Sequence, residues 1–187
     1  QIFFSLSSYF ILSSCLRFEY ALLSRGSNKF SKFKINLISF HALLFVVFIS
    51  VLFCLICFYF DLKIYKSLGF LLFFLPLFTF FGGLVMLYTI NDISTKKFKL
   101  LSQSKIAQNF SLTFSQISLG LLNFTNFGLF WSDLIGKVAF VFLNFDKKYF
   151  NAVLKYINDN SLSKTLIISK KYKSFPVLML PSKFFNI

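Results

Sequence analysis

The sequence predicts an all-α protein, a polytopic bundle of transmembrane helices. Of its 187 residues, 57% are hydrophobic. They form long, nearly unbroken blocks rather than the short periodic runs of a soluble domain. The mean hydropathy of the chain is +0.73. Lysines gather in the links between the blocks, which is how inner-membrane proteins mark their cytoplasmic side.

The net charge of +14 by itself would suit a nucleic-acid-binding protein. The position of the lysines between apolar blocks favours a membrane protein instead, so we expect membrane lipids and no nucleic acid as partners. Cys15, Cys54 and Cys57 lie inside apolar blocks and are interpreted as small buried hydrophobic residues. The sequence has no evident nucleotide-binding loop, metal-ligand cluster or catalytic triad. We therefore predict no cofactor, no metal, no catalytic residue and no enzymatic activity.

Residues 1–23 form the first predicted span, long enough to cross a bilayer at about 1.5 Å per residue. They contain Arg17 and Glu19, two positions apart, which would point to different faces of one helix. Each is therefore expected to find a partner on another helix. Charge within a membrane is costly unless it faces protein or water, so both are candidates for a substrate pathway. A structural ion pair with a neighbouring helix is the alternative.

Residues 35–60 and 68–90 form the second and third predicted spans. The second has almost no polar face and is long enough to span with tilt. The third contains Pro76 and the pair Gly82-Gly83, which predict a bendable helix. Bent helices often accompany transport sites, and a static kink is the alternative.

Residues 103–122 and 127–143 form a helical hairpin, the fourth and fifth predicted spans, joined by an uncharged turn at residues 123–126. The second arm carries Asp133 and Lys137. They are four residues apart, so they share one helix face and can pair. They either form a polar patch on a substrate pathway or act as a neutralised pair that packs the bundle.

On the first arm of the hairpin, Lys105, Gln108 and Gln116 are candidates to line a hydrated cavity. The alternative for the two glutamines is interhelical hydrogen bonding, worth about 0.6 kcal/mol each. Gly128 and Gly136 lie on a similar face of the second arm, and we expect them to serve close helix packing.

The links between the blocks alternate between strongly positive and nearly neutral. In chain order their net charges are +4 (residues 24–34), +1 (61–66), +3 (91–105), 0 (123–126) and +5 (144–174). The positive-inside rule then places the first, third and fifth links in the cytoplasm. Residues 145–174 are interpreted as a basic, amphipathic cytoplasmic linker, with an ordinary solvated linker as the alternative. Residues 175–187 begin a further helix.

Several short motifs, in order, resemble segments of oligosaccharide flippases. Leu16-Arg17-Phe18-Glu19-Tyr20-Ala21 resembles the end of the family's second helix. The motifs that resemble the fourth to seventh helices are at residues 75–77 with 96–99, at 104–108 with 116–120, at 128–129 with 133–136, and at 171–176. Together they cover nearly all of the chain. They are similar to Wzx-type polysaccharide flippases of the multidrug/oligosaccharidyl-lipid/polysaccharide exporter superfamily.

The resemblance implies a chain that is a fragment of a longer protein, with helices two to six of a first lobe (residues 1–144) and the start of a second. It implies that undecaprenyl-diphosphate-linked oligosaccharide is flipped across the bacterial inner membrane for surface polysaccharide (O-antigen) synthesis. That lipid is then the expected partner, with a polysaccharide polymerase and a chain-length regulator as further ones. Phe18 departs from the family's usual Tyr.

In such a protein Arg17, Lys105 and Lys137 would offset the cost of carrying an anionic diphosphate through hydrocarbon. Two alternatives remain open. One is a multidrug or small-molecule exporter of the same fold. The other is a membrane polysaccharide polymerase or acyltransferase, which would need a larger external link than residues 61–66 or 123–126 provide.

Overall fold

The computed structural model describes residues 2–23, 29–60, 68–122, 125–145 and 177. Every regular element in this part of the chain is a helix. The predicted linker and the predicted start of a further helix lie almost entirely outside it, as does the link at residues 61–66. The elements are α1 (Ile2–Ser13), the 3-10 helix η1 (Phe18–Leu23), α2 (Lys29–Tyr59), the 3-10 helix η2 (Gly69–Phe74), α4 (Leu75–Ser94), α5 (Phe98–Leu121) and α6 (Thr125–Asn144).

Two helical segments, Lys32–Tyr59 and Gly69–Ser94, are long and apolar enough to cross a membrane. They correspond to the second and third predicted spans. The helical hairpin predicted for the fourth and fifth is present as α5 and α6, and α5 begins at Phe98, earlier than expected. The protein is thus all-helical, with two candidate membrane-spanning helices in its described part.

The first predicted span is not one continuous helix, and that expectation is wrong. α1 ends at Ser13, the chain turns through residues 14–17, and η1 begins at Phe18. Leu16 and Arg17 have φ angles of 47° and 61°, in the left-handed region. This conformation costs a residue with a Cβ roughly 1–2 kcal/mol. The surrounding packing holds it, since Cys15 and Arg17 are each 1% exposed.

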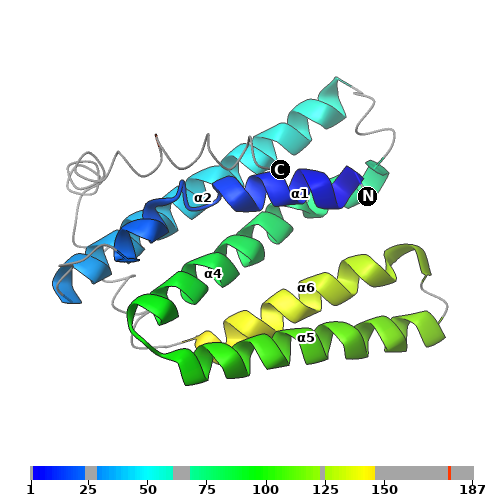
Figure 1. Cartoon of the computed structure of the whole chain (residues 1–187). Helices are drawn as coiled ribbons and strands as arrows, with labels where there is room; N and C mark the ends of the chain where they lie inside the picture. The colour runs from blue at the N-terminus through cyan, green and yellow to red at the C-terminus, as the bar shows by residue number, and fades with distance from the viewer. Residues whose placement is uncertain (1, 24–28, 61–67, 123–124, 146–176, 178–187) are drawn as a thin grey trace.

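Helix α4 lies at the centre of the fold. It contacts α1, α2 and η1 on one side and α5 and α6 on the other. Figure 1 shows α4 running between the α1/α2 layer and the antiparallel α5/α6 hairpin. Both layers are therefore positioned by their contacts with α4.

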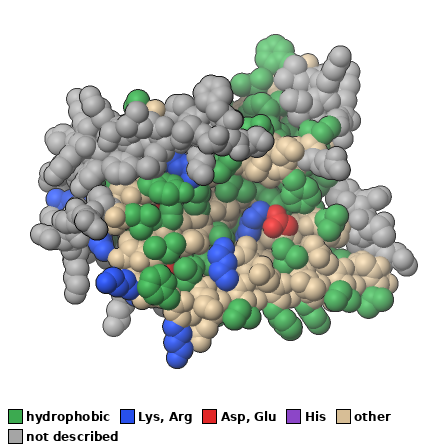
Figure 2. All heavy atoms as spheres, viewed as in Figure 1, with side chains coloured by type: hydrophobic (Ala, Val, Ile, Leu, Met, Phe, Trp, Pro, Cys, Tyr) green, Lys and Arg blue, Asp and Glu red, His purple; other side chains and the backbone are tan. Residues whose placement is uncertain are grey.

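The basic links that the structure describes meet at one end of the molecule. There α2 begins, α4 ends and α5 begins (Figure 1). Lys32 donates from Nζ to the carbonyl oxygen of Ser94 at 2.8 Å, and Asn36 donates from Nδ2 to Oδ1 of Asn91 at 2.8 Å. Figure 2 shows Lys and Arg side chains gathered at this end, on the left of the view. The arrangement agrees with the alternation of link charges in the sequence.

At the other end, an aromatic cluster joins α1, α4 and α6. The ring centroids of Phe3 and Phe78 lie 5.1 Å apart, those of Phe3 and Phe130 5.2 Å apart, and those of Phe78 and Phe130 4.6 Å apart. All three side chains are buried. Edge-on and tilted aromatic pairs of this kind add to the dispersion energy of packing. The cluster fixes the angle at which α6, and with it the hairpin, lies against α4.

Pro76 marks a helix start rather than a bend within a helix. The 3-10 helix η2 ends at Phe74, and α4 begins at Leu75 with Pro76 in its first turn. This is where proline fits best, because the first backbone N–H groups of a helix have no intrahelical acceptor. The predicted bend thus takes the form of a junction between η2 and α4.

Gly82 and Gly83 are sites of close helix packing. A Cβ on Gly82 would lie 2.5 Å from Cδ1 of Ile11. A Cβ on Gly83 would overlap the side chain of Leu43 and lie 2.7 Å from Oγ of Ser14. These two positions let α1 and α2 approach the backbone of α4, as small residues do in membrane helix pairs.

Gly83→Ala is expected to lower the free energy of unfolding by about 1–3 kcal/mol, because the new methyl group overlaps packed neighbours. Gly120→Ala is the matched control, since nothing lies within 4 Å of a Cβ built at Gly120 in α5. The control should gain about 0.5–1 kcal/mol from its higher helix propensity. Unfolding of the purified chain in detergent, followed by circular dichroism, measures both. Equal effects of the two substitutions would contradict the packing described for α4.

Candidate functional site

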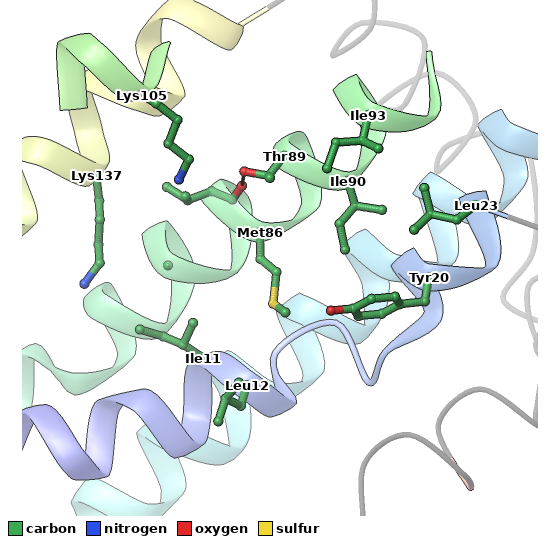
Figure 3. A pocket seen from close by; sticks show the side chains of 12 residues that line it. Ile11, Leu12, Tyr20, Leu23, Met86, Thr89, Ile90, Ile93, Lys105 and Lys137 are labelled. Atoms are coloured by element: carbon green, nitrogen blue, oxygen red, sulfur yellow. Dashed lines mark hydrogen bonds between the residues drawn. The ribbon is translucent and has the colours of Figure 1, made fainter. Parts of the chain in front are cut away.

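A cavity of about 510 Å³ lies between the two layers, toward the basic end of the molecule. Its walls come from the end of α1, from η1, from α4 and from the hairpin. Most of the lining side chains are apolar, and Lys105 and Lys137 are the charged ones. Figure 3 shows these two lysines reaching in from the hairpin, opposite Ile11 and Leu12.

Lys105 lies in the second turn of α5. Its Nζ donates to Oε1 of Gln108 at 3.2 Å and lies 4.8 Å from the centroid of the Phe140 ring. Neither partner carries a formal charge. Among the described residues, no carboxylate forms an ion pair with Lys105. Its positive charge in the cavity wall thus has no counter-ion in the part of the chain that the structure describes.

Lys137 lies on α6 and has a carboxylate partner. Its Nζ donates to Oδ2 of Asp133 at 2.5 Å and lies 4.4 Å from the centroid of the Phe78 ring. The predicted pairing of Asp133 with Lys137 is therefore confirmed. Asp133 itself does not line the cavity. Lys137 thus lies between the cavity on one side and its counter-ion on the other.

Both lysines lie at similar depth. Lys105 is about 10 Å from the start of α5 at Phe98, and Lys137 about 10 Å from the end of α6 at Asn144, given about 1.5 Å per residue. Because the two helices are antiparallel, the backbones of these two residues lie at similar depth along the hairpin. In a bilayer this level would lie just inside the hydrocarbon boundary at the basic end.

Arg17 and Glu19 form a buried ion pair behind the cavity wall. Nη1 of Arg17 is 3.8 Å from Oε1 of Glu19, and the two side chains are 2% and 0% exposed. The expectation that they point to different faces of a helix and pair elsewhere is wrong. It assumed a continuous α-helix, whereas the left-handed turn at Leu16 and Arg17 brings the two side chains together.

The ion pair touches the cavity only through its neighbours. Nη1 of Arg17 donates to the hydroxyl of Tyr20 at 3.4 Å and contacts Sδ of Met86 at 3.9 Å. Tyr20 and Met86 line the cavity, whereas Arg17 and Glu19 do not. Within the described residues, Nε and Nη2 of Arg17 and both carboxylate oxygens of Glu19 have no hydrogen-bond partner.

Neither of the two glutamines that were predicted to line a cavity is part of its lining. Gln108 is half-buried and holds Lys105, and its backbone lies against α6, where a Cβ on Gly136 would be 3.0 Å from the Gln108 carbonyl oxygen. Gln116 is also half-buried but does not line the cavity. At Gly128 an added Cβ would lie 3.5 Å from Cβ of Leu119. The close packing predicted for Gly136 is thus confirmed, whereas Gly128 has room for an ordinary van der Waals contact with an added Cβ.

The sequence reasoning missed the wall that α4 contributes. Gly82, Met86, Thr89 and Ile93 line the cavity from this helix. Their spacing of four, three and four residues places them on one helix face. This spacing could have identified the lining face of α4. It was not recognised because nearly all residues of the block are apolar, so that no face stands out in the sequence.

The cavity suits an amphipathic anion. Apolar side chains from α1, α4 and η1 would contact a hydrocarbon chain, and the two ammonium groups would contact a charged head group. Of the three cations that the structure describes at or behind the wall, two have a carboxylate partner, so Lys105 supplies the net charge of this set. No cluster of His, Cys, Asp or Glu that could hold a metal ion occurs among the described residues.

Removal of one member of the Arg17–Glu19 pair should destabilise the fold strongly. Arg17→Met or Glu19→Met alone leaves a buried, uncompensated charge, for which we expect a loss of about 3–5 kcal/mol of unfolding free energy. The double variant Arg17→Met/Glu19→Met buries no charge and should be more stable than either single variant. A double-mutant cycle on detergent-solubilised protein measures the coupling. Additive losses would show that the two side chains do not act as a pair.

No family model, no curated protein and no solved structure matches this chain. Its function is therefore inferred from its own residues and their arrangement.

Proposed function

We propose that this chain is part of a multi-pass transporter of the bacterial inner membrane that flips undecaprenyl-diphosphate-linked oligosaccharide to the outer leaflet. The observation that carries the proposal is the cavity in which Lys105, which has no carboxylate partner among the described residues, faces a largely apolar wall. A lipid with a diphosphate head group has matching chemistry, with charge at one end and hydrocarbon at the other. The order of the flippase-like motifs along the chain supports the same assignment.

The packing of the helices supports a polytopic lobe of the multidrug/oligosaccharidyl-lipid/polysaccharide type. The charged groups at residues 17, 19, 105, 133 and 137 lie on helices and turns that pack against α4. Such charges are tolerated at membrane depth where they pair or face a hydrated cavity. In this proposal α5 and α6 cross the bilayer beside the two candidate spans. α1 crosses it only together with η1, which continues in the same direction after the break.

The basic end would face the cytoplasm, where the lipid-linked substrate is made. The cavity lies toward this end, so the head group would reach Lys105 and Lys137 soon after it enters. Release on the far side would need the cavity to open the other way, which in this proposal follows from rocking of one lobe against another.

A small-molecule exporter of the same architecture is the second candidate. The cavity volume and apolar lining suit a drug-sized compound as well. The two lysines, however, would repel the cationic amphiphiles that many exporters carry. An anionic lipid therefore fits the charges of the cavity better.

Cysteine labelling tests the orientation. The native cysteines Cys15, Cys54 and Cys57 are 1%, 3% and 0% exposed, so they should not react with a membrane-impermeant maleimide. Lys99→Cys at the basic end should react from the cytoplasmic side alone, and Leu122→Cys at the other end of α5 from the periplasmic side alone. Labelling in intact cells and in inverted vesicles distinguishes the two sides. Reaction of both positions from one side would rule out a membrane-crossing α5.

Complementation tests the function. The gene that encodes this chain should restore surface polysaccharide to a flippase-null strain, and Lys105→Ala should reduce the restored amount at least about tenfold, as loss of a charge-assisted contact predicts. Lys99→Ala is the matched control, an exposed lysine of the same helix outside the cavity. Polysaccharide is quantified by gel electrophoresis of cell-surface extracts. A protein that inserts and folds but restores nothing would refute the proposed function.

A further inference from the structure

Among the described residues, three cations lie at or behind the wall of the cavity, and they differ in how their charge is compensated. Arg17 has Glu19 at 3.8 Å, and Lys137 has Asp133 at 2.5 Å. Lys105 has the neutral side chains of Gln108 and Phe140. The Arg17–Glu19 pair is fully buried and does not line the cavity. Within the described part of the chain, a ligand therefore meets one charge without a counter-ion and one charge that is already paired.

The geometry around Lys137 places its counter-ion outside the cavity. Lys137 lines the cavity and lies over the Phe78 ring, whereas Asp133 is one helical turn nearer the start of α6 and is not part of the lining. The side chain of Asp133 is 25% exposed and that of Lys137 is 13% exposed. A ligand anion and the Asp133 carboxylate would thus approach the same ammonium group from different directions.

We propose that Asp133 is a specificity-determining residue that competes with an anionic ligand for Lys137 and so limits the affinity of the cavity for a second phosphate. This inference rests on the proposed function and deepens it. The first phosphate of a prenyl diphosphate contacts Lys105. The second phosphate contacts Lys137. There it competes with the Asp133 carboxylate, which attracts the Lys137 ammonium group and repels the phosphate.

A transporter gains from such a competitor. In a cavity with a largely apolar lining, two unpaired ammonium groups would hold a diphosphate strongly, because Coulomb interactions are screened less there than in bulk water. Passage through a membrane protein requires binding strong enough for entry and weak enough for release. With Asp133 present, Lys137 has a counter-ion both before the ligand binds and after it is released.

Binding of short prenyl probes to the full chain in phosphatidylcholine nanodiscs tests the inference. Asp133→Asn should bind farnesyl diphosphate about tenfold more tightly than the native chain, the size expected for loss of one competing close charge. The gain should be smaller for farnesyl monophosphate and absent for farnesol, which carries no charge. Asp133→Ser should repeat the result, and Asp133→Glu, which keeps the charge, should not.

Asp92→Asn is the matched control, because it removes the same charge from a residue of α4 that does not line the cavity. It should leave the ratio of diphosphate to farnesol affinity unchanged. Circular dichroism of each variant checks the fold. Unchanged or weaker diphosphate binding by folded Asp133→Asn and Asp133→Ser variants would overturn the role of Asp133. Equal affinity of the native chain for farnesyl diphosphate and farnesol would instead refute the anion-binding cavity, and with it the proposed function.

Discussion

The close approach of α1 and α2 to the backbone of α4 at Gly82 and Gly83 is the constraint on which the rest of the structure depends. Neither position has room for a Cβ. In a bilayer, helices gain little from leaving lipid for one another, so contact distance and interhelical hydrogen bonds decide their association. The glycines let one helix serve as the common wall of two layers. The cavity, the buried ion pair and the orientation of the hairpin all follow from the position of that helix.

The sequence predicted what local composition determines. Long apolar blocks gave the helical class and the two candidate spans, and the spacing of Asp133 and Lys137 gave their ion pair, because both depend on residues close in the chain. It could not predict the break at residues 14–17. No glycine or proline marks that turn, and Leu16 and Arg17 adopt a left-handed conformation held by packing from other helices. The pairing of Arg17 with Glu19 depends on the break and was missed with it.

The candidate site was predicted to a similar extent. Lys105 and Lys137 were identified because a charged residue in an apolar block is conspicuous, whereas Gln108 accepts a hydrogen bond from Lys105 but does not itself line the cavity. Met86 and Thr89 were not identified. In an apolar block many residues could equally line a cavity, and tertiary packing decides which helix face does so. Gln116 lies on the predicted arm but outside the cavity. Its position shows that a polar residue in a helix is a weaker guide than a charged one, because a neighbouring helix can satisfy it.

The packing of α1 has a consequence for the order in which the structure forms. At the break the backbone closes on itself, with the N–H groups of Ser14, Leu16 and Phe18 donating to the carbonyls of Ile11, Ser13 and Cys15. The walls that α1 packs against belong to α4, which the ribosome adds more than sixty residues later. In the proposed membrane protein, α1 would therefore reach its packed position only after α4 has been synthesised.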